Sequence, residues 1–132
     1  MTSIDEPGEI PGYEVEALAR VLADQAKDVQ LLLRFLAENL SDAWPGAVEV
    51  KRSGMLGKGK VSSVDVHLGG DHFSIRIEHS RMQAVVAKVV GGIEISHSEL
   101  EADEWIRRLA ERLSGEAARS EAARAALFRL IS

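Results

Sequence analysis

Apolar and polar residues alternate strictly along Val61–His79, on both sides of a Gly-Gly-Asp sequence. A period of two is typical of half-buried strands, so this stretch predicts a β-hairpin. With Gly70-Asp71 as a two-residue turn, Gly70 supplies the positive φ angle that a type II′ turn needs. This register pairs Asp65 with Arg76 across the strands. It places the apolar side chains on the opposite face, and these are Val64, Val66, Leu68, Phe73, Ile75 and Ile77.

A leucine-rich stripe runs from Tyr13 to Leu40 and predicts one long amphipathic helix. At about 1.5 Å per residue this helix is about 40 Å long, which is more than a four-stranded sheet needs to cover it. The excess apolar surface predicts a second partner, and a second copy of the chain is the simplest candidate. We therefore expect a homodimer. The residues expected at the dimer contact are Leu22, Val29, Leu32 and Leu36.

Two further strands are predicted on either side of the hairpin. Residues 47–53 alternate in polarity, and residues 54–60 form a loop that leads into the hairpin. Residues 82–90 are apolar on both faces, which indicates a strand that is covered on both sides. Residues 93–95 either complete this strand or begin a short fifth one.

The C-terminal part of the chain predicts helix. Ser98 and Glu101 form an S-x-x-E capping box, so we expect a helix to begin near Glu99. Ser114-Gly115 predicts a break, followed by an alanine-rich helix over residues 116–131. The predicted fold class is therefore α+β: a long N-terminal helix, a four-stranded antiparallel β-meander, and a C-terminal helix or helix pair packed on one sheet face.

Length and charge predict how the chain is organised into domains. The chain has 132 residues, a mass of 14.4 kDa and a net charge of −5, and it contains no cysteine. This length fits one domain, over residues 13–132, and the absence of cysteine excludes disulfides and thiol chemistry. Residues 1–12 are expected to be a flexible acidic segment. The N-terminus lacks the basic and apolar stretches of a signal peptide, so we expect a cytoplasmic protein.

The loop at residues 54–60 carries a partial phosphate-binding motif. Gly54-x-x-x-x-Gly59-Lys60 matches most of a P-loop, but Val61 stands where the motif needs a hydroxyl group, and a strand follows where it needs a helix. We interpret the segment as a positively charged connection. If the protein binds nucleic acid, the candidate phosphate contacts are Lys51, Arg52, Lys58 and Lys60.

The polar face of the hairpin holds a candidate metal-ligand set. Asp65, His67 and His72 share this face, and two imidazoles with a carboxylate suit transition metals. In the predicted register, however, the guanidinium of Arg76 lies opposite Asp65 and competes with a cation. We therefore expect no metal and no cofactor, and no catalytic residue is assigned.

The striped helix followed by VEVKRSGMLGKGKVSSVDV resembles the helix-then-sheet opening of YbaB-type nucleoid-associated proteins, over about the first half of the chain. The resemblance implies a dimer that binds DNA. The chain departs from that pattern in its longer sheet, its capped two-part C-terminal end and its lack of a basic bias.

The leading interpretation is a small non-enzymatic protein–protein interaction or adaptor module that forms a homodimer. Its partners are a second copy and another protein, with no membrane partner. The candidate docking face consists of Asp65, His67, Arg76 and Glu78. One alternative is a weak nucleic-acid-binding dimer, which the missing basic bias disfavours. A second alternative is a small-ligand carrier or an enzyme, whose pocket a sequence does not reveal.

Overall fold

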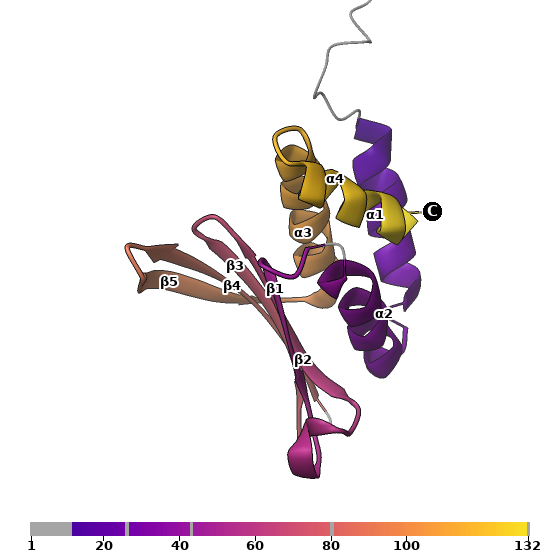
Figure 1. Ribbon diagram of the computed structural model, residues 1–132, viewed down its shortest axis with the longest axis vertical. Coiled ribbons are helices and arrows are strands. Elements are labelled where there is room, and N and C mark those ends of the chain that lie inside the picture. Colours follow the sequence, from indigo (N-terminus) through magenta and orange to yellow (C-terminus); the bar gives the residue numbers. More distant parts are fainter. Residues whose placement is uncertain (1–11, 26, 43, 80, 132) are drawn as a thin grey trace, which may run out of the picture.

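The chain forms an antiparallel sheet with helices before and after it (Figure 1). The computed structural model describes residues 12–25, 27–42, 44–79 and 81–131. The elements are α1 (Gly12–Gln25), α2 (Val29–Ser41), β1 (Val48–Arg52), the short 3-10 helix η1 (Met55–Gly57), β2 (Val61–Leu68), β3 (Asp71–Glu78), β4 (Arg81–Val90), β5 (Ile93–Leu100), α3 (Ala102–Ala117) and α4 (Glu121–Ile131). The predicted α+β class is confirmed. The predicted strand number is wrong, because the sheet has five strands in the order β1 to β5.

The predicted acidic segment at residues 1–12 lies outside the described residues, except for Gly12, where α1 begins.

The prediction of a single long N-terminal helix is wrong, because two helices replace it. Helix α1 ends at Gln25, and Asp28 caps α2: its Oδ1 accepts hydrogen bonds from the backbone N–H of Gln30 at 2.9 Å and of Leu31 at 3.4 Å. The break lets the two halves of the stripe face different surroundings. Helix α1 packs mainly against α3, whereas α2 packs against β1 and β2, and both helices also contact α4.

The polarity pattern of the hairpin is confirmed, but its register is wrong. Val66 pairs with Phe73, and Asp65 pairs with Ser74 instead of Arg76. The turn is Gly69-Gly70, and Gly69 has a φ angle of 63°. Because the shift changes the pairing by two residues, every side chain keeps its predicted face.

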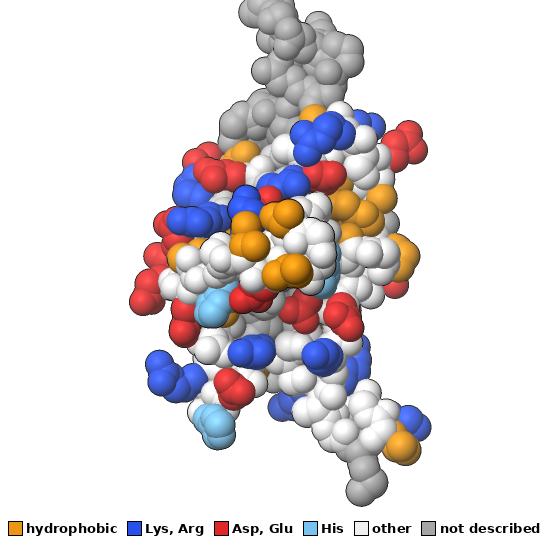
Figure 2. Space-filling view, turned by 90° about the vertical axis from the view of Figure 1, so that its left-hand side faces the viewer, with side chains coloured by type: hydrophobic (Ala, Val, Ile, Leu, Met, Phe, Trp, Pro, Cys, Tyr) orange, Lys and Arg blue, Asp and Glu red, His pale blue; other side chains and the backbone are white. Residues whose placement is uncertain are grey.

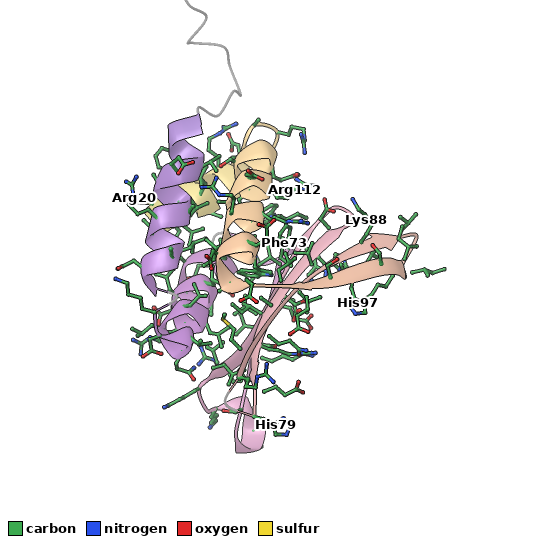
Figure 3. All side chains as sticks on the ribbon, turned by 180° about the vertical axis from the view of Figure 1, so that it is seen from behind. Arg20, Phe73, His79, Lys88, His97 and Arg112 are labelled. Carbon is green, nitrogen blue, oxygen red and sulfur yellow. The ribbon has the colours of Figure 1, made fainter. Side chains whose placement is uncertain are left out.

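A cluster of charges explains why the turn is displaced. Asp71 becomes the first residue of β3, and Nε of Arg112 in α3 donates to its Oδ2 at 3.0 Å. Lys88 of β4 lies 3.1 Å from the other carboxylate oxygen. The guanidinium also donates to the Leu68 carbonyl at 3.0 Å and to Glu116 at 2.6 Å. Arg112 thus ties the hairpin turn to α3, and Figure 3 shows Lys88 and Arg112 on the same side of the sheet.

The first C-terminal helix, α3, starts later than predicted. Strand β5 extends to Leu100, and Ser98 pairs with Val86 in the sheet, so the predicted capping box does not form. Helix α3 also runs through the predicted break at Ser114-Gly115 and ends at Ala117. A strand pairing of eight residues provides many more backbone hydrogen bonds than the two that a capping box offers.

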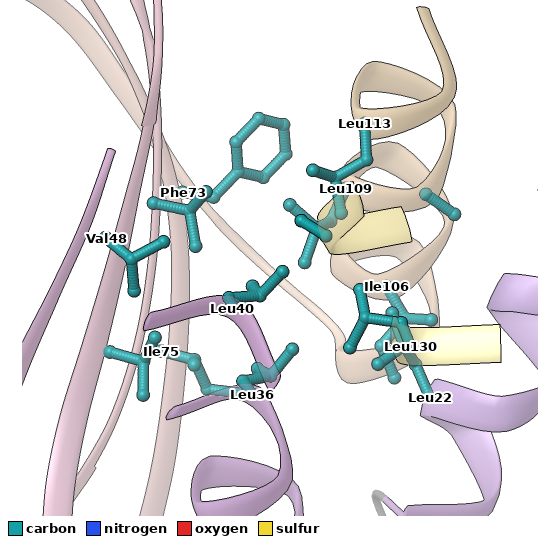
Figure 4. Close-up of a cluster of buried hydrophobic side chains, with 14 of the residues drawn as sticks. Leu22, Leu36, Leu40, Val48, Phe73, Ile75, Ile106, Leu109, Leu113 and Leu130 are labelled. Atoms are coloured by element: carbon teal, nitrogen blue, oxygen red, sulfur yellow. The ribbon is translucent and has the colours of Figure 1, made fainter. Parts of the chain in front are cut away.

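Sheet and helices share one apolar core (Figure 4). Trp105 of α3 is fully buried, and its ring meets Phe73 edge-on at a centroid distance of 6.2 Å. Its indole N–H donates to the Val85 carbonyl at 3.1 Å, which joins α3 to β4. Figures 1 and 3 show the helices on one side of the sheet, so none of the described helices covers the opposite sheet face.

Candidate functional site

The open face of the sheet carries a shallow groove of about 420 Å³. Its floor is formed by Val85 and Ala87 of β4, whose short side chains are flanked by longer ones on the neighbouring strands. The walls are His72, Ser74 and Arg76 of β3 on one side, Glu94, His97 and Glu99 of β5 on the other, and Gln83 at one end. The groove is therefore polar on both sides and apolar at its base.

Two histidines meet beside this groove. His67 and His72 are directly opposite each other in the β2–β3 pairing. Nδ1 of His67 lies 3.2 Å from Nε2 of His72, and the ring centroids are 4.0 Å apart. Burial, and next the neighbouring imidazole of His67, lower the pKa of His72. The next pair along the same face is Asp65 and Ser74, whose hydroxyl donates to the carboxylate at 2.6 Å.

The other half of the predicted docking face lies further along the strands. Arg76 donates through Nε to the side chain of Gln83 at 2.8 Å, and the backbone of Glu78 pairs with Arg81. Glu78 is exposed and lines a second depression near the β3–β4 turn. The structure thus places the predicted residues in separate contacts: Asp65 with Ser74, His67 with His72, and Arg76 with Gln83.

The tip of the β4–β5 hairpin exposes aliphatic side chains that sequence reasoning missed. The exposed fractions are 58% for Val90, 68% for Ile93 and 61% for Ile95. Figure 2, which views the molecule from the side of this hairpin, shows hydrophobic side chains gathered among charged ones. On the groove side of β5, Nδ1 of His97 lies 2.9 Å from Glu94. The alternation of Ile93 and Ile95 indicated a strand, but it did not reveal that this strand lies at the edge of the sheet.

The residues predicted for the dimer contact lie in or against the hydrophobic core. Leu22, Leu32 and Leu36 are fully buried within the chain, and Val29 packs partly buried against the same core. The three leucines therefore offer no surface to a second copy. The apolar excess that suggested self-association is accommodated by the division into α1 and α2.

The candidate phosphate contacts gather around the β1–β2 connection. Lys51, Arg52, Lys58 and Lys60 are all exposed, and none makes an ion pair with a carboxylate within the part of the chain that is described. Arg52 donates to the Gly59 carbonyl at 3.4 Å.

Two absences concern the described residues alone. Among residues 12–25, 27–42, 44–79 and 81–131, no group of three or more His, Asp or Glu side chains is placed to hold a metal ion. None of the described helices has the length and apolarity that crossing a bilayer requires.

Comparisons of the chain with protein-family models, with curated proteins and with solved structures find no match.

Proposed function

We propose that the chain is a non-enzymatic protein–protein interaction module that forms a homodimer through the edge strand β5. One observation carries this proposal: residues Ile93 to Glu99 are all exposed along the edge of the sheet, beside the aliphatic hairpin tip. Exposed aliphatic patches and long sheet edges are features by which proteins recognise other chains. Binding of another protein and a cytoplasmic location stay predictions.

The two edges of the sheet differ in how well they are protected. Strand β1 has five residues, contains Lys51 and Arg52, and its pairing becomes irregular between these two residues. Strand β5 has eight residues and contains no Lys, Arg or Pro. Shortness, basic side chains and proline are the usual means of blocking an edge. The β5 edge can therefore accept a further strand, and pairing two copies would join their sheets.

The charges on β5 are compatible with antiparallel self-pairing. In the β4–β5 ladder, Val89 pairs with Glu94 and Lys88 with Ser96, so Ile95 is an extra residue. Glu94 and His97 consequently both line the groove, although they are three residues apart. A twofold axis between Ile95 and Ser96 would place Glu94 of each copy opposite His97 of the other.

This arrangement also brings apolar side chains into contact and keeps the remaining carboxylate of β5 away from other carboxylates. The two Ile95 side chains come together on the sheet face opposite the groove, as an isologous interface requires, and each Ile93 lies on the same face across from Ser98 of the other copy. By counting along the strands, Glu99 faces Gly92 of the second copy. No carboxylate of β5 then faces a carboxylate of the other copy.

Light scattering on the native chain and on a double variant tests the proposal. The native protein is expected at about twice the chain mass of 14.4 kDa. Ile93→Asp with Ile95→Asp should reduce it to the chain mass, because the two carboxylates introduced at position 95 would meet across the twofold axis and two more would replace apolar side chains on the same face. The matched control is Leu56→Asp with Phe128→Asp, whose parent side chains are 84% and 63% exposed on other elements. A native monomer, an unchanged mass of the β5 variant or an equal effect of the control would contradict the proposal.

A further inference from the structure

We infer that His67 and His72 form a binding site for one divalent late transition metal ion, such as Cu²⁺, Ni²⁺ or Zn²⁺. The two imidazoles stand on directly opposite positions of neighbouring strands, with Nδ1 of His67 3.2 Å from Nε2 of His72. Imidazole nitrogen suits these metals. The site is distinct from the β5 edge and does not depend on dimer formation.

The separation of the two nitrogens matches that of two ligands on one metal. With metal–nitrogen bonds of about 2.05 Å, neighbouring nitrogens lie about 2.9 Å apart in square-planar and about 3.4 Å apart in tetrahedral coordination. The observed 3.2 Å falls between these values. Both rings are half-buried on strands paired by a regular ladder, so the strands hold the pair in place before a metal arrives. Ring rotations would direct both lone pairs to a common point.

The proton balance is simple. Without metal, one neutral imidazole donates its N–H to the other. When a metal occupies the space between them, that proton moves to the outward ring nitrogen of the same residue, and both inward nitrogens become ligands. No oxidant or reductant is required.

The charges around the pair also permit a cation. The observed register places Asp65 opposite Ser74, and Arg76 is held by Gln83 instead of lying against Asp65. The guanidinium that argued against a metal in the sequence is therefore displaced. Asp65 precedes His67 by two residues on the same face and contributes a negative charge.

The described residues supply two ligands, not three, so water completes the coordination sphere. Such a site binds more weakly than a closed structural metal site. Affinity should follow the order in which Cu²⁺ binds more tightly than Ni²⁺ or Zn²⁺. Cu²⁺ is accordingly the probe of choice.

Titration of the full chain with Cu²⁺, followed by calorimetry and by electron paramagnetic resonance, tests the inference. We expect one site per chain with a spectrum of two coordinated nitrogens. His67→Gln and His72→Gln should each weaken binding at least tenfold and leave one nitrogen, while circular dichroism confirms the fold. His97→Gln is the matched control, because its ring lies on the same face but pairs with Glu94, and it should leave the affinity unchanged.

The competing outcome is a neutral histidine pair that only shares a hydrogen bond. In that case native protein and the His67→Gln variant would bind Cu²⁺ equally weakly. That result, or a loss of binding caused by His97→Gln alone, would overturn the assignment.

Discussion

Replacing Arg112 with methionine removes the clamp between the hairpin turn and α3 while keeping an aliphatic side chain of similar length. Arg112 donates to Asp71, to the Leu68 carbonyl and to Glu116, and about a quarter of its side chain remains exposed. After the substitution, Asp71 retains only Lys88, and the Leu68 carbonyl loses its side-chain donor. The variant therefore tests whether this cluster fixes the register of the hairpin.

The expected cost is about 2 kcal/mol in the free energy of unfolding. Hydrogen bonds that involve charged groups contribute about 1.5 to 3 kcal/mol when buried, and solvent exposure reduces this value. With an unfolding entropy of about 2.1 cal/mol/K per residue, the loss corresponds to a fall of about 7 °C in Tm. Calorimetry at equal protein concentrations measures it, since self-association makes Tm depend on concentration.

The stability that the Arg112 cluster contributes depends on pH. Burial raises the pKa of Asp71, but hydrogen bonds from Arg112 and Lys88 outweigh it, so the pKa lies below the ordinary 3.8. The hydrogen bond from Arg112 likewise holds the pKa of Glu116 below 4.5. Lowered carboxyl pKa values stabilise the fold above the unfolded pKa, and this stability is lost as the pH falls through the folded values. The cost of Arg112→Met should be complete at neutral pH and shrink below about pH 4.

Arg108→Met is the matched control, because Arg108 lies one turn earlier on α3 and forms a half-exposed pair with Glu104. It should cost no more than about 0.5 kcal/mol. The reasoning is refuted if Arg112→Met is no more destabilising than Arg108→Met at neutral pH, or if its cost is the same in acid.

Three further substitutions are predicted to lower stability, each measured by thermal or urea unfolding. Asp28→Ala removes the α2 cap and should cost about 1 kcal/mol, whereas a cost within error would show that the cap is not needed. Gly70→Ala places a Cβ 2.8 Å from the Val89 carbonyl oxygen, so we expect a loss of about 1 to 3 kcal/mol; a neutral result would mean that β4 moves freely away from the turn. Trp105→Phe loses the hydrogen bond to Val85 and some core volume, for about 2 kcal/mol, and an unchanged midpoint would contradict that contact.

The sequence predicted which side chains face the core of the hairpin more reliably than which residues pair. Alternation determines the face, and a shift of two residues leaves every face unchanged. The register depends on Asp71 meeting Arg112, which lies 41 residues later in the chain. A local pattern does not contain that contact, so the turn was placed one residue too late.

The same limit applies to the candidate surfaces. The leucine stripe is periodic across the break at Asp28, because α1 and α2 each need an apolar side. Periodicity alone therefore predicted one helix and a dimer contact that is in fact buried. The exposure of β5 depends on its place at the sheet edge, which follows from the number of strands. The meeting of His67 and His72 depends on the register.

Disulfide trapping tests the central proposal, the β5 dimer, most directly, because the chain contains no cysteine and gives no background. With the twofold axis between Ile95 and Ser96, the two Ile95 Cα atoms would lie about 6 Å apart, within the range of about 4.4 to 6.8 Å that a disulfide spans. Under mild oxidation, Ile95→Cys should form a covalent dimer much faster than Leu56→Cys, whose parent side chain is more exposed. Equal, slow cross-linking of the two variants would contradict the β5 dimer.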